Sequence, residues 1–559
     1  MNILVAQNIK ELKFIISNKK LNNDFSVLPI NLEIHTYCLI NKISHINIID
    51  LINNNFHKKT IIAGEKLVSD LDIKNLNSLA QKKVLRNFIR KRFYSACYLV
   101  NLIQEISKKN NVEKIIISGW CDLDVKNQFK SYIVSKIIKY FFDEKKINCL
   151  TIEKKNSQII QSKFDLKIES PPRSNKKTVL FTSLGYNANR LILIAFIKKL
   201  RIFIFHQEKI GLFKKIFTYL LGIKILKFQT SKVFKHSNIT VNDINFNFEN
   251  NNYSKYLTEE KNLFIESLEV LKSRCQSIDK FIEKNKISLI VSSIARDYQG
   301  YFSEAGKKLN IPSICISHGT VSKSYDDYDF IYKKNICEGV FDGEFKYFSI
   351  QSKICEQSLK SFPTNKKNLI TGNLIFADNL KNKTYGKKKL LYAVTLKDFY
   401  GLQLLGVELH CEFYENLKLI SEISKENKLD FIVNLHPSIS TYVMSNLKVL
   451  FPNLEFYSED INKSLKKSFV TISYSSSVIE DSLMSNVPVI LLDQWKRYKH
   501  CDAEINPLKG NHPIYYVNRK EDLLKSITTL RNSKNINYSK VSFGKNSTQN
   551  ISQMFDKII

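Results

Sequence analysis

Short apolar runs alternate with amphipathic stretches along most of the chain. Near its start, strands are expected at residues 2–7, 25–30, 114–118 and 148–153, and helices around 82–108 and 127–144. Strands that alternate with helices are typical of a parallel sheet covered by helices on both faces. The pattern therefore predicts an α/β fold, beginning with an N-terminal α/β region over residues 1–168.

A connector follows, because ESPPRSNKKT at residues 169–178 combines two prolines with polar and basic residues. After it, VLFTSLGYNANRLI again predicts a strand, a turn and a helix. Further strands are expected at 287–293, 311–317 and 368–373. We expect a Rossmann-like lobe over residues 169–379, ending where the basic linker LKNKTYGKKK begins.

The third unit, residues 380–559, has the same rhythm. Strands are expected at 390–395, 430–437, 454–458, 469–477 and 487–493, with helices between them and one at about 478–485. This pattern predicts a second Rossmann-like lobe that faces the first across a cleft.

Two stretches of the first lobe have a distinct composition. Residues 209–228, KIGLFKKIFTYLLGIKILKF, mix lysines with large apolar residues. They fit either an interfacial membrane helix or, as we favour, a core-facing helix with a solvated lysine side. The Asn-rich residues 241–256 predict a surface loop, and a long helix is expected from about Glu259, with Thr258 as its N-cap.

Size and composition agree with a folded, multidomain protein. The chain has 559 residues, too many for one compact core, and 43% of them are hydrophobic. Its ten cysteines are scattered without a Cys-x-x-Cys pair, which predicts neither a zinc cluster nor a disulfide framework. The start, MNILVAQNIKELKFI, resembles a buried strand more than a signal peptide, and no long apolar segment follows. We expect a cytoplasmic protein.

The formal net charge is +32. Nucleic-acid binding, attraction to an anionic membrane surface and compositional drift all fit such an excess of lysine. No Arg-rich arm, zinc finger or aromatic RNA-binding signature is present, so no nucleic-acid partner is expected. Drift explains part of the charge, and the remainder fits a membrane face or a polyanionic substrate.

The second lobe carries a serine turn, TISYSSSVIEDSLMSNVPVI, between an expected strand and a helix. Ser475, Ser476 and Ser477 would lie at the carboxyl end of the strand, where open α/β sheets bind ligands. The amino end of a helix attracts anions, and serine adds donors without bulk. Phosphate binding and plain helix capping remain equally open, although a cap needs only one serine. Asp481, or its neighbour Glu480, would approach a ribose.

Histidines end one expected strand in each lobe. His436 precedes Pro437 in NLHP, and that proline directs the imidazole to the ligand side. His318 follows an apolar strand in ISHGT, and histidine is a common general base. Asp297 in RDYQG is a second candidate base, whereas YDDYD at 325–329 predicts a solvated loop.

These motifs occur in the same order in a group of bacterial cell-surface enzymes. SHGT, TGN at 371–373, HP and YSSS…D…VPVI resemble GT-B glycosyltransferases of capsule and lipopolysaccharide synthesis, including sialyl- and Kdo-transferases. They are also similar to CDP-glycerol glycerophosphotransferases. The resemblance covers roughly residues 287–495, whereas the first 170 residues share only the alternating pattern.

The resemblance implies a site. The three serines, with His436 and Pro437, would hold the donor's phosphate and nucleotide, and Asp481 would reach the ribose. Gly372 and Thr395 complete the implied donor site, while His318 and Asp297 are the implied catalytic residues. Two features depart from the family: the acidic-acidic-Gly motif has only a distant match in FDGE at 341–344, and Asn486 stands where glycine is usual.

The implied activity is transfer of a sugar, which includes CMP-activated sugar acids, from a nucleotide donor to a surface polysaccharide or lipid-linked glycan. It would need no metal or other cofactor, since hydroxyls, His436 and a helix dipole would stabilise the departing phosphate. A polyol-phosphate transferase of the CDP-glycerol or ribitol type is the first alternative. A non-catalytic basic protein that binds glycans or polyanions is the second. Peripheral contact with the inner face of the membrane would suit a lipid-linked acceptor.

Overall fold

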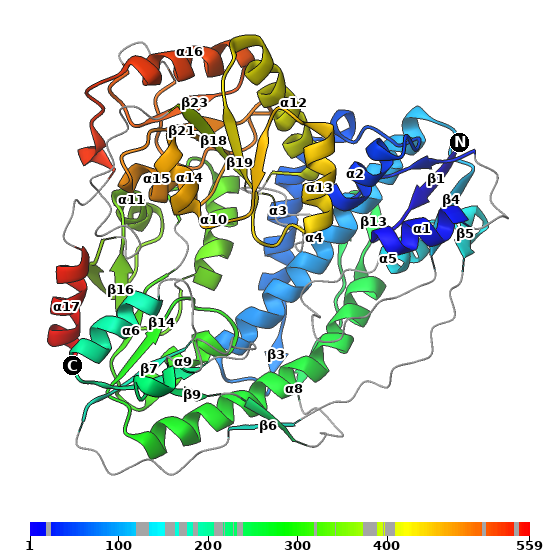
Figure 1. Cartoon of the computed structure of the whole chain (residues 1–559). Helices are drawn as coiled ribbons and strands as arrows, with labels where there is room; N and C mark the ends of the chain where they lie inside the picture. Colours follow the sequence, from blue (N-terminus) through cyan, green and yellow to red (C-terminus); the bar gives the residue numbers. More distant parts are fainter. Residues whose placement is uncertain are drawn as a thin grey trace.

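The computed structural model describes most of the chain: residues 1–17, 24–118, 134–150, 163–166, 176–182, 188–205, 216, 218–226, 228–231, 239–317, 321–340, 342–372, 388–394, 396, 408–505, 510–541 and 547–559. Two doubly wound parallel lobes and an enlarged N-terminal part are visible in Figure 1. They confirm the predicted α/β, GT-B-like architecture. Among the described residues, no helix has the length and apolar character needed to cross a bilayer.

The first lobe is built on a parallel sheet with the order β17-β16-β15-β14-β7-β8-β9. Its strands are β7 (Thr178–Phe181), β8 (Arg201–Phe205), β9 (Lys224–Leu226), β14 (Leu289–Ser292), β15 (Ser313–Cys315), β16 (Tyr347–Ile350) and β17 (Lys367–Ile370). Its helices are α6 (Ala188–Ile197), α9 (Asp297–Lys308), α10 (Asp327–Val340) and α11 (Lys353–Ser361). Residues of β7 and β14 are almost fully buried, as expected for central strands of a covered parallel sheet.

The second lobe has the parallel order β20-β19-β18-β21-β22-β23. Its strands are β18 (Lys389–Ala393), β19 (Phe431–Asn434), β20 (Glu455–Tyr457), β21 (Ser468–Ser473), β22 (Val489–Leu492) and β23 (Ile514–Val517). Its helices are α12 (His410–Asn427), α13 (Thr441–Leu450), α14 (Ile461–Lys467), α15 (Val478–Met484) and α16 (Lys520–Asn532). The last helix, α17 (Ser547–Ile558), packs on α6 of the first lobe.

The N-terminal part has a smaller parallel sheet with the order β2-β1-β4-β5. Its strands and helices are β1 (Asn2–Val5), β2 (Ser26–Val27), β4 (Lys114–Ser118), β5 (Ile147–Leu150), α1 (Ile9–Ser17), α2 (Leu32–Ile40), α3 (Asn54–Ser69), α4 (Leu79–Lys109) and α5 (Val134–Phe141). The long helix α8 (Ser254–Asn285) packs beside α4 and contributes to the same core. The predicted boundaries at 168 and 379 fall outside the described residues and stay predictions.

Short elements complete the fold. Antiparallel pairs join β3 (Ile73–Lys74) to β11 (Thr240–Val241), β6 (Lys163–Leu166) to β10 (Phe228–Ser231), and β12 (Asn247–Phe248) to β13 (Asn251–Asn252). The 3-10 turns are η1 (Ile49–Leu51), η3 (Glu144–Lys146) and η4 (Tyr538–Lys540).

Two local predictions are wrong. The long helix begins at Ser254, so Thr258 lies inside its first turns, where its hydroxyl accepts a hydrogen bond from the Ile244 amide at 3.1 Å. The expected loop over 241–256 therefore contains the β12–β13 hairpin and the start of α8. The single helix expected over 209–228 is also wrong, because Gly222 has φ +65° and strand β9 follows it.

A group of histidines, of which His35 and His410 are buried, joins the N-terminal part to the second lobe. The ring of His35 on α2 lies 5.8 Å from the ring of His410 on α12 and 5.4 Å from that of His45. Burial, and then the charges of His410, His45 and Lys418, lower the pKa of His35 to about 2. Burial also lowers the pKa of His410 to about 4. Both rings are therefore neutral in the folded protein at neutral pH.

This junction predicts an acid-sensitive stability. The pKa of an unfolded histidine is about 6.5, so as the pH falls from about 6.5 to 4 the unfolded chain binds protons that folded His35 does not. The free energy of unfolding should fall by about 1.4 kcal/mol per pH unit for each such histidine. Urea unfolding at several pH values should show that the free energy of unfolding depends less steeply on pH in His35→Phe than in the parent. Tyr414→Phe keeps the histidines and should keep the slope of the parent; equal slopes in all three proteins would contradict the prediction.

Candidate functional site

The carboxyl edge of the second lobe carries most of the predicted donor residues. Strands β19 and β21 lie on either side of β18, so His436 and Ser475 are at the same edge of the sheet with one strand between them. The Ser473 hydroxyl donates to the carbonyl of Ala393, the last residue of β18, at 3.0 Å. Thr395 lies outside the described residues, although its neighbour Val394 is buried at this edge.

The serine turn leads directly into α15, as predicted. Ser475 is buried, and the Ser476 hydroxyl accepts a hydrogen bond from the Val478 amide at 3.2 Å. Ser477 occupies the N-cap position, yet its side chain makes no capping hydrogen bond. Simple capping therefore accounts for Ser476 and does not account for Ser477.

His436 is held in one tautomer by its own turn. The Ser438 amide donates to Nδ1 at 3.1 Å, and the Ser438 hydroxyl lies 2.7 Å from the same nitrogen. Because an amide can only donate, Nδ1 accepts and the proton of the neutral ring is on Nε2. Pro437 is exposed at the tip of this turn. Nε2 therefore carries the N–H donor of this ring.

Both acidic residues of α15 are buried. Asp481 and Glu480 are each 4% exposed, although adjacent helical positions point in different directions. The Glu480 carboxylate accepts a hydrogen bond from the hydroxyl of Ser352, the N-cap of α11 in the first lobe. Glu480 therefore joins the two lobes, while the predicted contact of Asp481 with a ribose stays a prediction.

The carboxyl edge of the first lobe meets the second at this point. Gln351, which precedes Ser352, donates through its side-chain amide to the Ser317 carbonyl. Ser317 is the residue before His318, which itself lies outside the described residues with Gly319 and Thr320. Glu480 of α15 is thus hydrogen-bonded to Ser352, and the adjacent Gln351 is hydrogen-bonded to Ser317. These contacts connect α15 to the residue that precedes His318.

The chain after residue 320 is also attached to the second lobe. The Ser322 hydroxyl donates to the His500 carbonyl, and the Tyr325 hydroxyl lies 3.1 Å from an Asp502 carboxylate oxygen. Lys323 forms an ion pair with the same carboxylate at 2.8 Å. Both flanks of the predicted catalytic histidine therefore lie where the lobes meet.

Two further predicted residues lie at the carboxyl edge of the first lobe. Gly372 follows β17, is buried, and has φ +68°, a backbone conformation that favours glycine. Asp297 is the first residue of α9 after β14. In the YDDYD stretch, Asp326 and Asp327 are exposed, but the predicted loop is wrong from Asp327 onward, because α10 begins there and Asp329 is buried. Asp326 accepts a hydrogen bond from the Asp329 amide at 2.7 Å.

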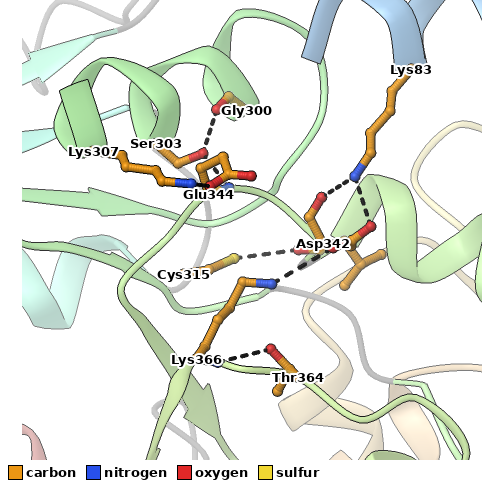
Figure 2. A network of polar contacts seen from close by, with 10 residues as sticks. Lys83, Gly300, Ser303, Lys307, Cys315, Asp342, Glu344, Thr364 and Lys366 are labelled. Atoms are coloured by element: carbon orange, nitrogen blue, oxygen red, sulfur yellow. Dashed lines mark hydrogen bonds and ion pairs between the residues drawn. The ribbon is translucent and has the colours of Figure 1, made fainter. Parts of the chain in front are cut away.

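The FDGE stretch lies at the opposite edge. Residues 342–346 lead into the amino end of β16, away from Ser317. Asp342 pairs with Lys83 at 2.7 Å and with Lys366 at 3.7 Å, and Glu344 pairs with Lys307 (Figure 2). Asp342 and Glu344 therefore neutralise lysines, Asp342 also links α4 to the first lobe, and we do not assign either residue as the base.

Sequence reasoning missed the buried charges under the serine turn. Arg497 donates two hydrogen bonds to Glu412, at 2.9 and 2.5 Å, and both side chains are 2% exposed. The guanidinium lies 5.4 Å from the ring centre of Tyr474, the residue before Ser475. No local signal predicts a pair whose members are 85 residues apart. It fixes the base of the turn.

This ion pair predicts a large stability effect. Glu412→Gln would leave the Arg497 charge buried without its counter-charge, and breaking a buried pair costs about 3–5 kcal/mol. Glu415→Gln, on the same helix, breaks a partly exposed pair with Lys418 and should cost less than about 1 kcal/mol. Denaturant unfolding of both variants measures the difference, and equal small losses would contradict the role given to Arg497.

In the described part of the chain, no group of three or more His, Cys, Asp or Glu residues is placed to hold a metal ion. Metal independence stays a prediction, because it concerns the reaction rather than the described residues alone.

Comparisons with known proteins give only distant neighbours. No protein-family model and no curated protein sequence matches the chain. The UDP-GlcNAc 2-epimerase of Methanocaldococcus jannaschii is 15% identical, with a TM-score of 0.41, over 68% of this chain and 99% of the epimerase. The UDP-GlcNAc 2-epimerase of Neisseria meningitidis, solved with UDP-GlcNAc, is 14% identical, with a TM-score of 0.39, over 68% of this chain and 100% of the epimerase. The wall teichoic acid polymerase TagF is 13% identical, with a TM-score of 0.39, over 68% of this chain and 88% of the polymerase. Function is therefore inferred from this chain's own residues.

Proposed function

We propose that the chain is a glycosyltransferase that moves a sugar from a nucleotide donor to a bacterial surface polysaccharide or lipid-linked glycan. The observation that carries the proposal is the meeting of the two carboxyl edges, where Glu480 and Ser352 connect the serine turn to the residue before His318. Ligands of open α/β sheets bind at this edge. A capsular or lipopolysaccharide acceptor, and CMP as the donor nucleotide, are the finer parts of the proposal.

The second lobe would hold the donor. Ser475, Ser476 and Ser477 would bind the phosphate with the first amides of α15, and His436 would donate from Nε2 to a phosphate or base oxygen. Gly372, Thr395 and Asp481 would complete the site, with Asp481 near the ribose. Hydrogen-bond donors placed before the reaction stabilise the charge that develops on the leaving phosphate.

The first lobe would supply the base. An acceptor hydroxyl would attack the anomeric carbon while His318, or Asp297, takes its proton. The bond between that carbon and the donor phosphate oxygen breaks, and the nucleotide leaves with the electron pair. Water is kept from the reaction as the lobes meet over the donor.

The donor site predicts a selective loss of binding. Ser476→Ala combined with Ser477→Ala should weaken nucleotide binding at least about tenfold, because hydrogen bonds to charged groups contribute about 1.5–3 kcal/mol each. Thermal shifts with CMP, CDP, UDP and GDP identify the probe, and calorimetry with that nucleotide measures the loss. Ser445→Ala, an exposed serine of α13, is the control. An unchanged affinity in the double variant would remove the serine turn from the site.

A second prediction separates catalysis from binding. His318→Ala should lower nucleotide release during turnover by at least about a hundredfold, the usual contribution of a general base, while donor affinity changes little. Equal losses of turnover and affinity would make His318 a binding contact.

The released nucleotide distinguishes the alternatives. UDP would indicate an ordinary hexose donor, whereas CMP would indicate a sugar acid or the polyol-phosphate chemistry, which product analysis then separates. Salt-sensitive polyanion binding without turnover, unaffected by His318→Ala, would support the non-catalytic alternative.

A further inference from the structure

One face of the first lobe exposes large apolar side chains. Helix α6 is apolar around most of its circumference: Leu191 and Ile194 are buried, while Ile197 is 68% exposed. In the next crossover, Tyr219 and Leu220 are 83% and 74% exposed. A helix that is apolar all round is usually buried or in contact with lipid.

These residues lie on one face of the sheet. Strands β7, β8 and β9 follow each other in the sheet in chain order, and parallel crossovers are right-handed, so α6 and the segment before β9 cover the same face. Leu191 and Ile223 share one hydrophobic cluster, to which α17 also contributes. Figure 1 shows α6 beside α17 at this end of the lobe. We call the exposed residues the α6 face: Leu193, Phe196, Ile197, Ile216, Tyr219 and Leu220.

Basic residues border the α6 face. Lys176 and Lys177 precede β7, Lys199 precedes β8, and Lys224 begins β9, so all four lie at the amino edge of the same three strands. Lys176, Lys177 and Lys199 are exposed. The crossover segments end at this edge, which places Ile197 and Leu220 next to the basic row. Apolar side chains beside clustered lysines are the combination that binds an anionic bilayer surface.

We propose that the α6 face docks the protein on a membrane surface rich in anionic phospholipid. The apolar side chains enter the boundary between headgroups and acyl chains, and the basic row pairs with lipid phosphates. The charge argues for this occupant: a second copy of the chain would bring another basic row against the first. Docking is independent of the proposed activity, because it needs no donor and no turnover.

Vesicle co-sedimentation of the full chain tests the proposal. Binding is expected to mixed phosphatidylglycerol–phosphatidylcholine vesicles, to weaken with salt, and to be much lower on phosphatidylcholine alone. Ile197→Asp with Leu220→Asp should reduce binding at least about tenfold, since each removes a large apolar contact. The matched control is Val449→Asp with Ile505→Asp, which changes two residues of 70% and 75% exposure elsewhere and should bind like the parent.

Charge variants give a second measurement. Lys176→Gln with Lys199→Gln should reduce binding to anionic vesicles about fivefold for each charge lost, whereas Lys425→Gln with Lys428→Gln on the second lobe should not. Circular dichroism checks that each variant is folded. Equal losses of vesicle binding in the α6-face variants and the control variants, or no vesicle binding by the parent, would overturn the proposal. Analytical ultracentrifugation that instead shows a dimer of the parent, which dissociates in Ile197→Asp, would also overturn it.

Discussion

The candidate site depends on the parallel pairing of the described strands in the two large sheets. Parallel strands place all their carboxyl ends at one edge, so residues far apart in the sequence, such as His436 and Ser475, come to the same edge of the sheet. The same constraint applies to Ser317 and Gln351 in the first lobe. Once the two lobes meet along these edges, one junction collects polar groups from strands of both sheets.

That junction is held by buried polar groups rather than by apolar packing alone. Glu480 is almost inaccessible to solvent, and its carboxylate would be costly to bury without the Ser352 hydroxyl from the other lobe. Nearby, Ile354 of α11 packs in one cluster with Ile479 of α15. Hydrogen bonds need defined geometry, so Glu480 fixes how the lobes lie relative to each other. The apolar cluster stabilises the contact between them. Arg497 and Glu412 act in the same way within the second lobe.

The sequence predicted what local pattern determines. Five of the six described strands of the second lobe, the start of α15 at Val478 and the place of His436 after β19 follow from periodicity and turn residues, whereas β23 and α16 were not predicted. It failed where tertiary structure decides. The pairs Glu412–Arg497 and Ser352–Glu480 join residues whose proximity comes only from the sheet order, and Thr258 is drawn inside α8 by an earlier helix start. The FDGE stretch was a poor candidate for the base because it precedes β16. Residues that precede a strand of a parallel sheet lie at the amino edge of that sheet, opposite the edge where ligands bind.

This distinction between the two edges also separates the two roles proposed for the first lobe. Strands β7 and β8 have four and five residues, so the amino and carboxyl edges of this sheet are about 13–17 Å apart along the strand direction. A surface bound at the amino edge would therefore leave the carboxyl edge open to donor and acceptor. A membrane contact on the carboxyl edge would compete with the second lobe for Ser352 and Ser322, whose hydroxyls already bond to it. Docking through the α6 face keeps those bonds, so attachment and chemistry need not exclude each other.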